Sequence, residues 1–130
     1  MQEIFGYHYT ITPDTTRTLW TIRDFANNWC DEGAGLVSSV VVRDLNGDGI
    51  AENAFVYNVQ GSCDVSPIPY KLMLHSNERK YAVRGNNKVM ADMEPGAEAN
   101  GGEKNFDAAF DTAPPEFRAL ADSLWNATVK

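Results

Sequence analysis

The feature that most constrains this 130-residue chain is a series of short apolar segments that alternate with polar turns. The segments are rich in aromatic and β-branched residues, as strands are. Turn-forming stretches such as TPDTT and NERK separate several of them. Short connections between consecutive strands favour antiparallel pairing. We therefore expect one antiparallel meander sheet built from six segments: IFGYHYTI, RTLWTIRDF, LVSSVVVRDL, NAFVYNVQG, YKLMLHS and YAVRG.

The C-terminal segment TAPPEFRALADSLWNATVK has a different, helical periodicity. Paired prolines stand at its start, where a helix tolerates them, and Thr112 is the candidate cap. Apolar residues then recur at three- and four-residue spacing, at Phe117, Leu120, Ala121 and Leu124. The pattern predicts a helix over about 114–127, packed on the sheet by its apolar side. The expected fold class is therefore α+β.

The stretch EPGAEANGGEKN is rich in Gly, Ala, Glu and Asn and has no apolar period. It predicts a mobile surface loop over about 94–105. No repeat or linker divides the chain, and its length suits one ordinary domain. We expect a single domain over residues 1–130.

The chain carries 18 acidic and 11 basic residues, a formal net charge of −7. Such a charge repels phosphate backbones, so we expect no nucleic-acid partner. It suits metal cations or a basic protein partner, although acidity also simply keeps small domains soluble. No apolar run approaches the roughly 18 residues that a membrane span needs, so we expect no membrane span.

Residues 43–57, RDLNGDGIAENAFVY, combine a calcium-loop pattern with β-like flanks. Calcium binds six to eight oxygens, and compact loops supply them from positions 1, 3, 5, 7 and 9. Gly49 stands at position 6, where such a loop turns sharply. The pattern predicts a structural Ca²⁺ site, with ligands from Asp44, Asn46, Asp48, the Ile50 carbonyl and Glu52.

The same stretch is not an EF-hand, because Phe55 stands where that motif needs a bidentate Glu. It resembles the strand–DxNxDGxxE–strand loops of FG-GAP and integrin-type propeller blades, although this chain has one copy. The alternative is a plain hairpin whose two-residue turn is Asn46-Gly47. That alternative leaves three crowded carboxylates unexplained.

The remaining chemistry-bearing residues are few. Cys30 and Cys63 could form one disulfide or stay as free thiols, and sequence alone does not decide between them. Asp64 is a candidate extra ligand to the ion. His8 alternates with two tyrosines and should face away from both, as a structural histidine, while His75 should be exposed beside a turn.

No nucleophile, hydrolase or phosphate-binding motif accompanies these residues, so we expect a protein that is not an enzyme. The three tryptophans, Trp20, Trp29 and Trp125, fit core positions better than a sugar platform.

Several blocks, taken in order, resemble a family of small bacterial proteins described as surface polysaccharide biosynthesis proteins. The blocks are YHYT, LWTIRDF, VRDLNGDGIAENAFVY, SCDVSP, KLMLHSNERKYAVRG, GGEKNFDAAF and APPEFRALADSLW. The resemblance spans roughly residues 5 to 126 and implies no catalytic residue. Family members often carry a secretion signal, which implies a periplasmic or cell-surface location, with a cytoplasmic one as the alternative.

Two functions follow as expectations. The first is a calcium-binding domain that acts by binding a basic protein partner, as an immunity or inhibitor protein against a bacterial toxin would. The second is an accessory protein of surface polysaccharide biosynthesis that binds saccharide.

Overall fold

The computed structural model describes residues 2–26, 35–58, 60, 66–90 and 99–130. Its strands are β1 (Gln2–Ile11), β2 (Thr16–Ala26), β3 (Gly35–Leu36), β4 (Val41–Arg43), β5 (Glu52–Asn58), β6 (Pro69–Ser76), β7 (Arg79–Asn86), β8 (Lys88–Met90), β9 (Ala99–Gly101) and β10 (Lys104–Phe106). A 3₁₀-helix, η1 (Ala108–Thr112), precedes the helix α1 (Pro115–Thr128). The fold is α+β, as expected, and none of the described helices is long and apolar enough to cross a membrane.

The main sheet has the strand order β10-β7-β6-β5-β3, and β4 also pairs with β5. Every pairing in it is antiparallel. The consecutive strands β5, β6 and β7 pair in sequence order, as in the predicted meander, and the two residues Asn77 and Glu78 join β6 to β7.

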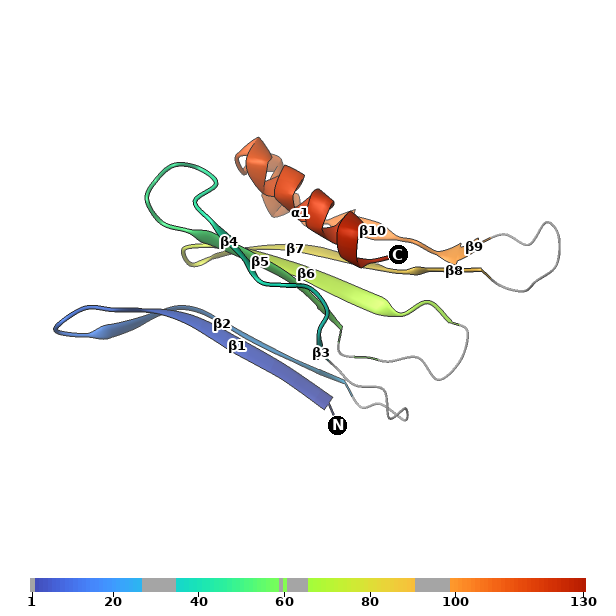
Figure 1. Ribbon diagram of the computed structural model, residues 1–130, viewed down its shortest axis with the longest axis horizontal. Coiled ribbons are helices and arrows are strands. Elements are labelled where there is room, and N and C mark those ends of the chain that lie inside the picture. Colours follow the sequence, from blue (N-terminus) through green and yellow to red (C-terminus); the bar gives the residue numbers. More distant parts are fainter. Residues whose placement is uncertain (1, 27–34, 59, 61–65, 91–98) are drawn as a thin grey trace.

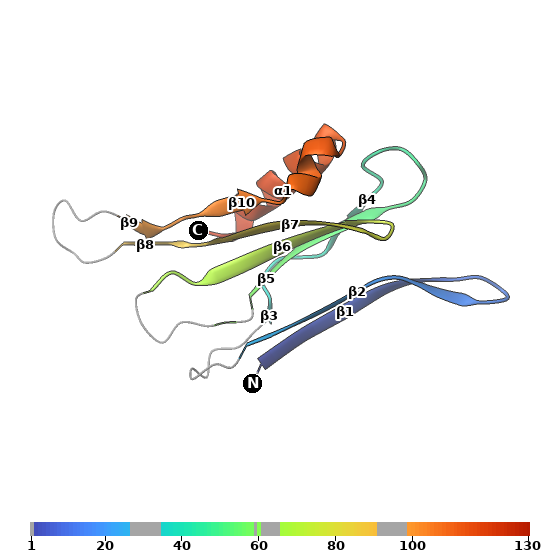
Figure 2. The same ribbon diagram turned by 180° about the vertical axis from the view of Figure 1, so that it is seen from behind.

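The prediction of one sheet is wrong, because β1 and β2 pair only with each other among the described strands. Their hairpin lies on one side of the main sheet and α1 lies on the other (Figures 1 and 2). Ile4, Trp20 and Ile22 of the hairpin pack against an apolar face of the sheet. That face would otherwise be exposed to water, so covering it is more favourable than extending the sheet edge.

The core therefore has two layers, one on each face of the main sheet. Alternate residues of β5 enter different layers: Ala54 and Val56 face α1, whereas Phe55 and Tyr57 face the hairpin. Burial runs without interruption from Glu52 to Tyr57 as a result. A strand covered on both faces reads as a continuous apolar run instead of an alternating one.

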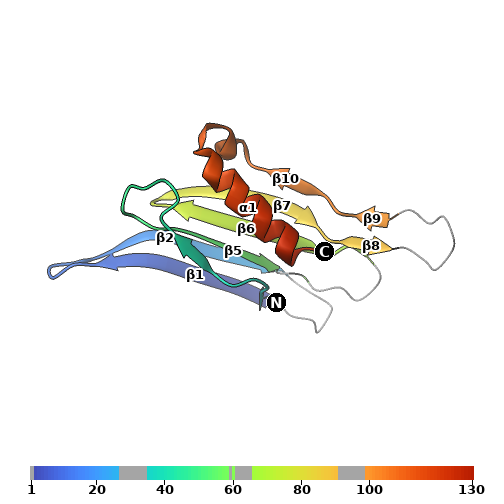
Figure 3. The same ribbon diagram turned by 45° about the horizontal axis from the view of Figure 1, so that its top comes forward.

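The helix α1 lies across β5, β6 and β7 (Figure 3). Its buried residues are Phe117, Ala121 and Trp125, with Leu120 and Leu124 only partly buried beside them. Trp125 thus lies on the buried side of α1, whereas the predicted apolar stripe ended at Leu124. The predicted Thr112 cap is wrong, because Thr112 ends η1 and Pro114 precedes α1 without a side-chain cap.

The predicted loop over 94–105 is only partly within the described residues, since 94–98 lie outside them. Residues 99–105 contribute to the strands β9 and β10, so the loop prediction is wrong for this part. Gly101 and Gly102 have φ of +85° and +82°, a conformation that glycine adopts without strain. They bend the chain between two short strands, and sequence alone reads such glycines as a loop.

Candidate metal centre

The loop between β4 and β5 is longer than a two-residue turn. The last pair of the β4–β5 ladder joins Arg43 to Glu52, so residues 44–51 lie outside the ladder. Gly47 and Gly49 have φ of +75° and +84°. These left-handed positions let the chain turn twice within the loop. The alternative of a hairpin with a two-residue Asn46-Gly47 turn is therefore wrong.

Asp44 organises the start of the loop through its carboxylate. Its Oδ1 accepts hydrogen bonds from the backbone N–H of Gly47 at 2.8 Å and of Asp48 at 3.2 Å, and its Oδ2 accepts from Gly49 at 2.8 Å. Charge-assisted bonds of this kind are stronger than neutral ones. The carboxylate is consequently fixed at the centre of the turn.

Asn46 and Asp48 continue the pattern two residues at a time. Asn46 Oδ1 accepts from the N–H of Asp48 at 3.2 Å, and Asp48 Oδ1 accepts from the N–H of Ile50 at 2.8 Å. The Asn46 amide also donates to Asp48 Oδ2 at 3.3 Å. Three of the predicted ligand side chains are thus held by the loop's own backbone, in the manner of Asx turns.

Glu52 reaches the loop from the first position of β5, and it is only 1% exposed. Its Oε2 accepts from the N–H of Leu45 at 2.6 Å, and its Oε1 accepts from the Ser76 hydroxyl at 3.1 Å. A buried carboxylate is costly unless hydrogen bonds or a cation compensate its charge. Within the described residues the hydrogen bonds are present, but no ion pair includes Glu52, Asp44 or Asp48.

Asp44, Asp48 and Glu52 converge on one point. One carboxylate oxygen from each lies within 4.8 Å of the other two. Calcium–oxygen distances are about 2.3–2.6 Å, so two oxygens on one ion are at most about 5 Å apart. The three carboxylates therefore fit a single cation, with two exposed ligands and one buried ligand.

Three predicted residues lie outside the described part of the chain. They are the candidate extra ligand Asp64 and the two cysteines, Cys30 and Cys63. Whether the cysteines are bonded thus stays open, as the sequence left it.

An apolar groove runs beside the loop, and sequence reasoning did not find it. It has a volume of about 830 Å³ and lies between β1 and the segment that contains β3, β4 and the end of the loop. Its lining includes Leu36, Val40, Val42, Ile50 and Phe55. Ile50 thus belongs both to the loop and to the wall of the groove. Only the packing of the hairpin over the sheet creates this space, so no local pattern could have indicated it.

His75 is buried, so the prediction that it is exposed is wrong. It is 2% exposed and stacks on Trp20, with ring centroids 3.8 Å apart. Burial, together with the charges of Lys80 and His8, lowers the pKa of His75 to about 4. The hairpin covers the end of β6, which the neighbouring polar turn had made look exposed.

His8 does face away from Tyr7 and Tyr9, as the alternation predicts, since both tyrosines are exposed. Its Nδ1 lies 3.4 Å from the Asn53 amide nitrogen. It therefore meets an amide of β5.

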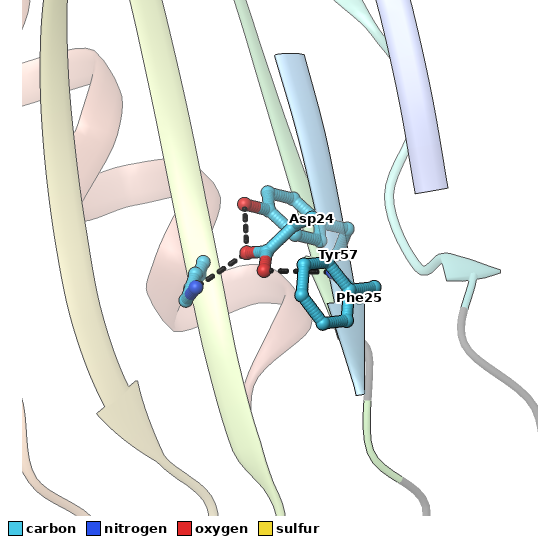
Figure 4. A network of polar contacts seen from close by, with 4 residues as sticks. Asp24, Phe25 and Tyr57 are labelled. Atoms are coloured by element: carbon cyan, nitrogen blue, oxygen red, sulfur yellow. Dashed lines mark hydrogen bonds and ion pairs between the residues drawn. The ribbon is translucent and has the colours of Figure 1, made fainter. Parts of the chain in front are cut away.

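Asp24 of β2 connects the hairpin to the main sheet by polar contacts (Figure 4). Its Oδ2 accepts a 3.0 Å hydrogen bond from the Tyr57 hydroxyl and forms an ion pair with Lys71. Burial raises the pKa of Asp24, but the bonds from Lys71 and Tyr57 outweigh it and hold that pKa below its usual range. Burial and the Asp24 carboxylate together raise the pKa of Tyr57.

Trp125 is buried between α1 and the main sheet, and Trp20 is half-buried between the hairpin and the sheet. Both therefore occupy core positions, whereas Trp29 lies outside the described residues.

The geometry at the loop offers hard oxygen ligands to a cation. The absence of enzymatic activity stays a prediction.

Comparison with known proteins found no matching family model, curated protein or solved structure. The resemblance to the surface polysaccharide proteins accordingly stays an expectation.

Proposed function

We propose that this chain is a non-enzymatic calcium-binding domain that acts by binding a protein partner. The observation that carries the proposal is the convergence of Asp44, Asp48 and Glu52 within 4.8 Å, with Glu52 buried. A bound cation would compensate the negative charge of the buried carboxylate and the repulsion among the three carboxylates. The Asn46 side-chain oxygen and the Ile50 carbonyl would raise the protein ligands to five, and water would supply the rest.

Calcium suits this loop better than magnesium. Calcium accepts flexible geometry and many protein oxygens, whereas magnesium keeps several waters and needs near-ideal octahedral geometry. Isolated extracellular calcium modules bind with Kd of about 0.1–1 mM. A site of that affinity is filled outside the cytoplasm, which agrees with the periplasmic or cell-surface location that we propose.

The role of the ion would be structural. It would connect Asp44 and Asp48 of the exposed loop to Glu52 at the start of β5. It would also fix Ile50, whose side chain lines the apolar groove. Calcium would thereby set the shape of one wall of a surface to which a partner can bind.

The partner that fits is a protein segment with apolar side chains for the groove and a basic residue for the acidic loop. The net charge of −7 favours the same partner through long-range attraction. An immunity protein that neutralises a basic bacterial toxin would use this combination, and it is the specific role that we propose.

Thermal unfolding tests the metal site. A ligand that binds only the native state raises the unfolding midpoint as its concentration increases. We expect added calcium to raise the midpoint measured in EDTA, and magnesium to raise it less. Asp48→Ala should abolish the calcium response, whereas Asp14→Asn, an exposed change in the β1–β2 turn, should retain it. Overlapping curves in EDTA and calcium would show that the loop binds no ion.

Co-purification with proteins encoded by neighbouring genes tests the partner. We expect a stoichiometric complex with a basic protein that weakens when Val40→Glu places a charge in the groove. Val40 is half exposed, so this change should not disturb the core. Recovery of no stoichiometric partner would refute the immunity role and leave the calcium site standing.

A further inference from the structure

The outer face of the β1–β2 hairpin is apolar and largely exposed, and two of its residues, Phe5 and Tyr7, also line the apolar groove. Its large side chains are Phe5, Tyr7, Tyr9, Ile11 and Phe25, with exposed fractions of 70, 65, 44, 72 and 59%. Single exposed apolar residues are ordinary, but a contiguous row of five marks an interaction surface. We call this set the hairpin face.

Strand geometry explains why these residues lie together. Successive side chains of β1 alternate, so Phe5, Tyr7 and Tyr9 point outward while Ile4 and His8 point toward the sheet. The Tyr7 and Tyr9 ring centroids are 5.6 Å apart. The residues that pair with this row on β2 are mostly threonines: Thr21 opposite Tyr7, Thr18 opposite Tyr9 and Thr16 opposite Ile11. The face is therefore a weakly polar surface along most of the hairpin.

The hairpin face carries almost no net charge, although the chain as a whole carries −7. Arg23 lies opposite Phe5, Glu3 lies opposite Phe25, and the two charged side chains form an ion pair with each other. A basic partner would find no unpaired carboxylate here among the described residues. The chemistry that complements the face is another neutral surface of aromatic and aliphatic side chains.

The area is sufficient for a stable contact between two copies. Aromatic side chains bury about 150–250 Å² each, and five side chains that are about 60% exposed offer roughly 600 Å² per copy. Two copies would bury about 1,200 Å² in total, which exceeds the roughly 1,000 Å² expected of a specific interface. The face can also match itself, because a two-fold axis near Tyr7 sets Phe5 of one copy against Tyr9 of the other.

From this combination of apolarity, neutrality and area we infer that the hairpin face is a homodimer interface, occupied by the same face of a second copy. The two hairpins pack face to face, at the roughly 10 Å separation of stacked sheets. The inference does not rest on the calcium site, because no residue of the hairpin belongs to loop 44–52.

Sedimentation equilibrium over a range of protein concentrations, in EDTA, tests the dimer. The wild type should associate to a dimer, and Phe5→Glu should raise the dimer Kd about thirtyfold or more, as loss of an interface hot spot does. Val37→Glu is the matched control, because Val37 is 41% exposed but lies between β3 and β4, outside the hairpin face and outside the lining of the apolar groove. Ile11→Lys provides a second disrupting variant at the other end of the face.

The salt dependence of binding distinguishes a second copy of the chain from a basic protein as the occupant of the hairpin face. Two chains of −7 repel each other, so added NaCl should strengthen the dimer by screening. An attraction to a basic protein should instead weaken with salt. A wild type that stays monomeric at about 100 μM in high salt overturns the inference, and so does a dimer that both Phe5→Glu and Ile11→Lys leave intact. The first result would leave the face to a different protein, and the second would place the interface elsewhere.

Discussion

Replacing Glu52 with glutamine isolates the effect of one buried charge on the metal site. Glutamine keeps the size of the side chain, removes the charge and replaces one acceptor oxygen with an NH2 donor, which the Ser76 hydroxyl can accept. In EDTA two effects oppose each other: the charge-assisted hydrogen bonds from Leu45 and Ser76 weaken, at about 1–2 kcal/mol in total, and the cost of burying a charge without a cation disappears. We therefore expect Glu52→Gln to lie within about 1 kcal/mol of the wild type in EDTA.

Calcium should then separate the two proteins. At 10 mM calcium and a Kd of about 0.1 mM, the wild type gains about 2.7 kcal/mol of stability. An unfolding entropy of about 2.1 cal/mol/K per residue, over 130 residues, converts this gain to a midpoint rise of about 10 °C. Glu52→Gln loses the one ligand that is held inside the protein, so it should show only a small part of this rise.

Thermal unfolding followed by circular dichroism, in EDTA and in 10 mM calcium, measures the four midpoints. Glu103→Gln is the control, because it makes the same chemical change at an exposed position between β9 and β10. The reasoning fails if calcium raises the midpoints of Glu52→Gln and the wild type equally. Equal rises would mean that Glu52 stabilises the fold without binding the ion.

Two further predictions concern the attachment of the hairpin. Asp24→Asn should lower the free energy of unfolding by about 1–2 kcal/mol in urea titrations, because it weakens the contacts with Lys71 and Tyr57, which water partly reaches; a variant as stable as the wild type would contradict this. The pKa of His75 is about 4 in the folded protein and 6.5 ordinarily, so between these values the unfolded chain binds more protons. Stability should consequently fall by up to about 3 kcal/mol as the pH drops from 6.5 toward 4. His75→Phe, compared with the wild type by urea unfolding at pH 7 and 4.5, should remove that part of the loss, and an unchanged pH dependence would contradict the assignment.

Local patterns in the sequence predicted the elements well where one segment decides its own structure. The helix over 114–127 was predicted to within a residue at each end, because prolines and an apolar period of three to four fix it locally. The alternation in IFGYHYTI correctly placed His8 on the other face of the strand from Tyr7 and Tyr9, for the same reason. The ligand spacing in DLNGDGIAE likewise predicted the convergence of Asp44, Asp48 and Glu52.

What the sequence did not predict depends on contacts between distant segments. The hairpin could have extended the sheet edge or covered its face, and only the match of Trp20 and Ile22 to Phe55 and Tyr57 decides for the face. The burial of His75 and the apolar groove are consequences of that choice. Local periodicity indicates which side chains lie on the same face of a strand or helix. It does not indicate which other element packs against that face.

The separate hairpin has a consequence for how the molecule opens. Among the described strands, β1 and β2 form a backbone ladder only with each other, and side chains dock the hairpin on the main sheet. It can therefore detach without breaking a ladder of the main sheet, as a cooperative unit of lower stability than the whole. Amide hydrogen exchange should reveal such a unit as a group of β1 and β2 amides that exchange together, ahead of β5, β6 and β7. In each such event Phe55, Tyr57 and Met73 meet solvent, so the lifetime of the closed hairpin limits how often the interior is exposed to proteases and to other chains.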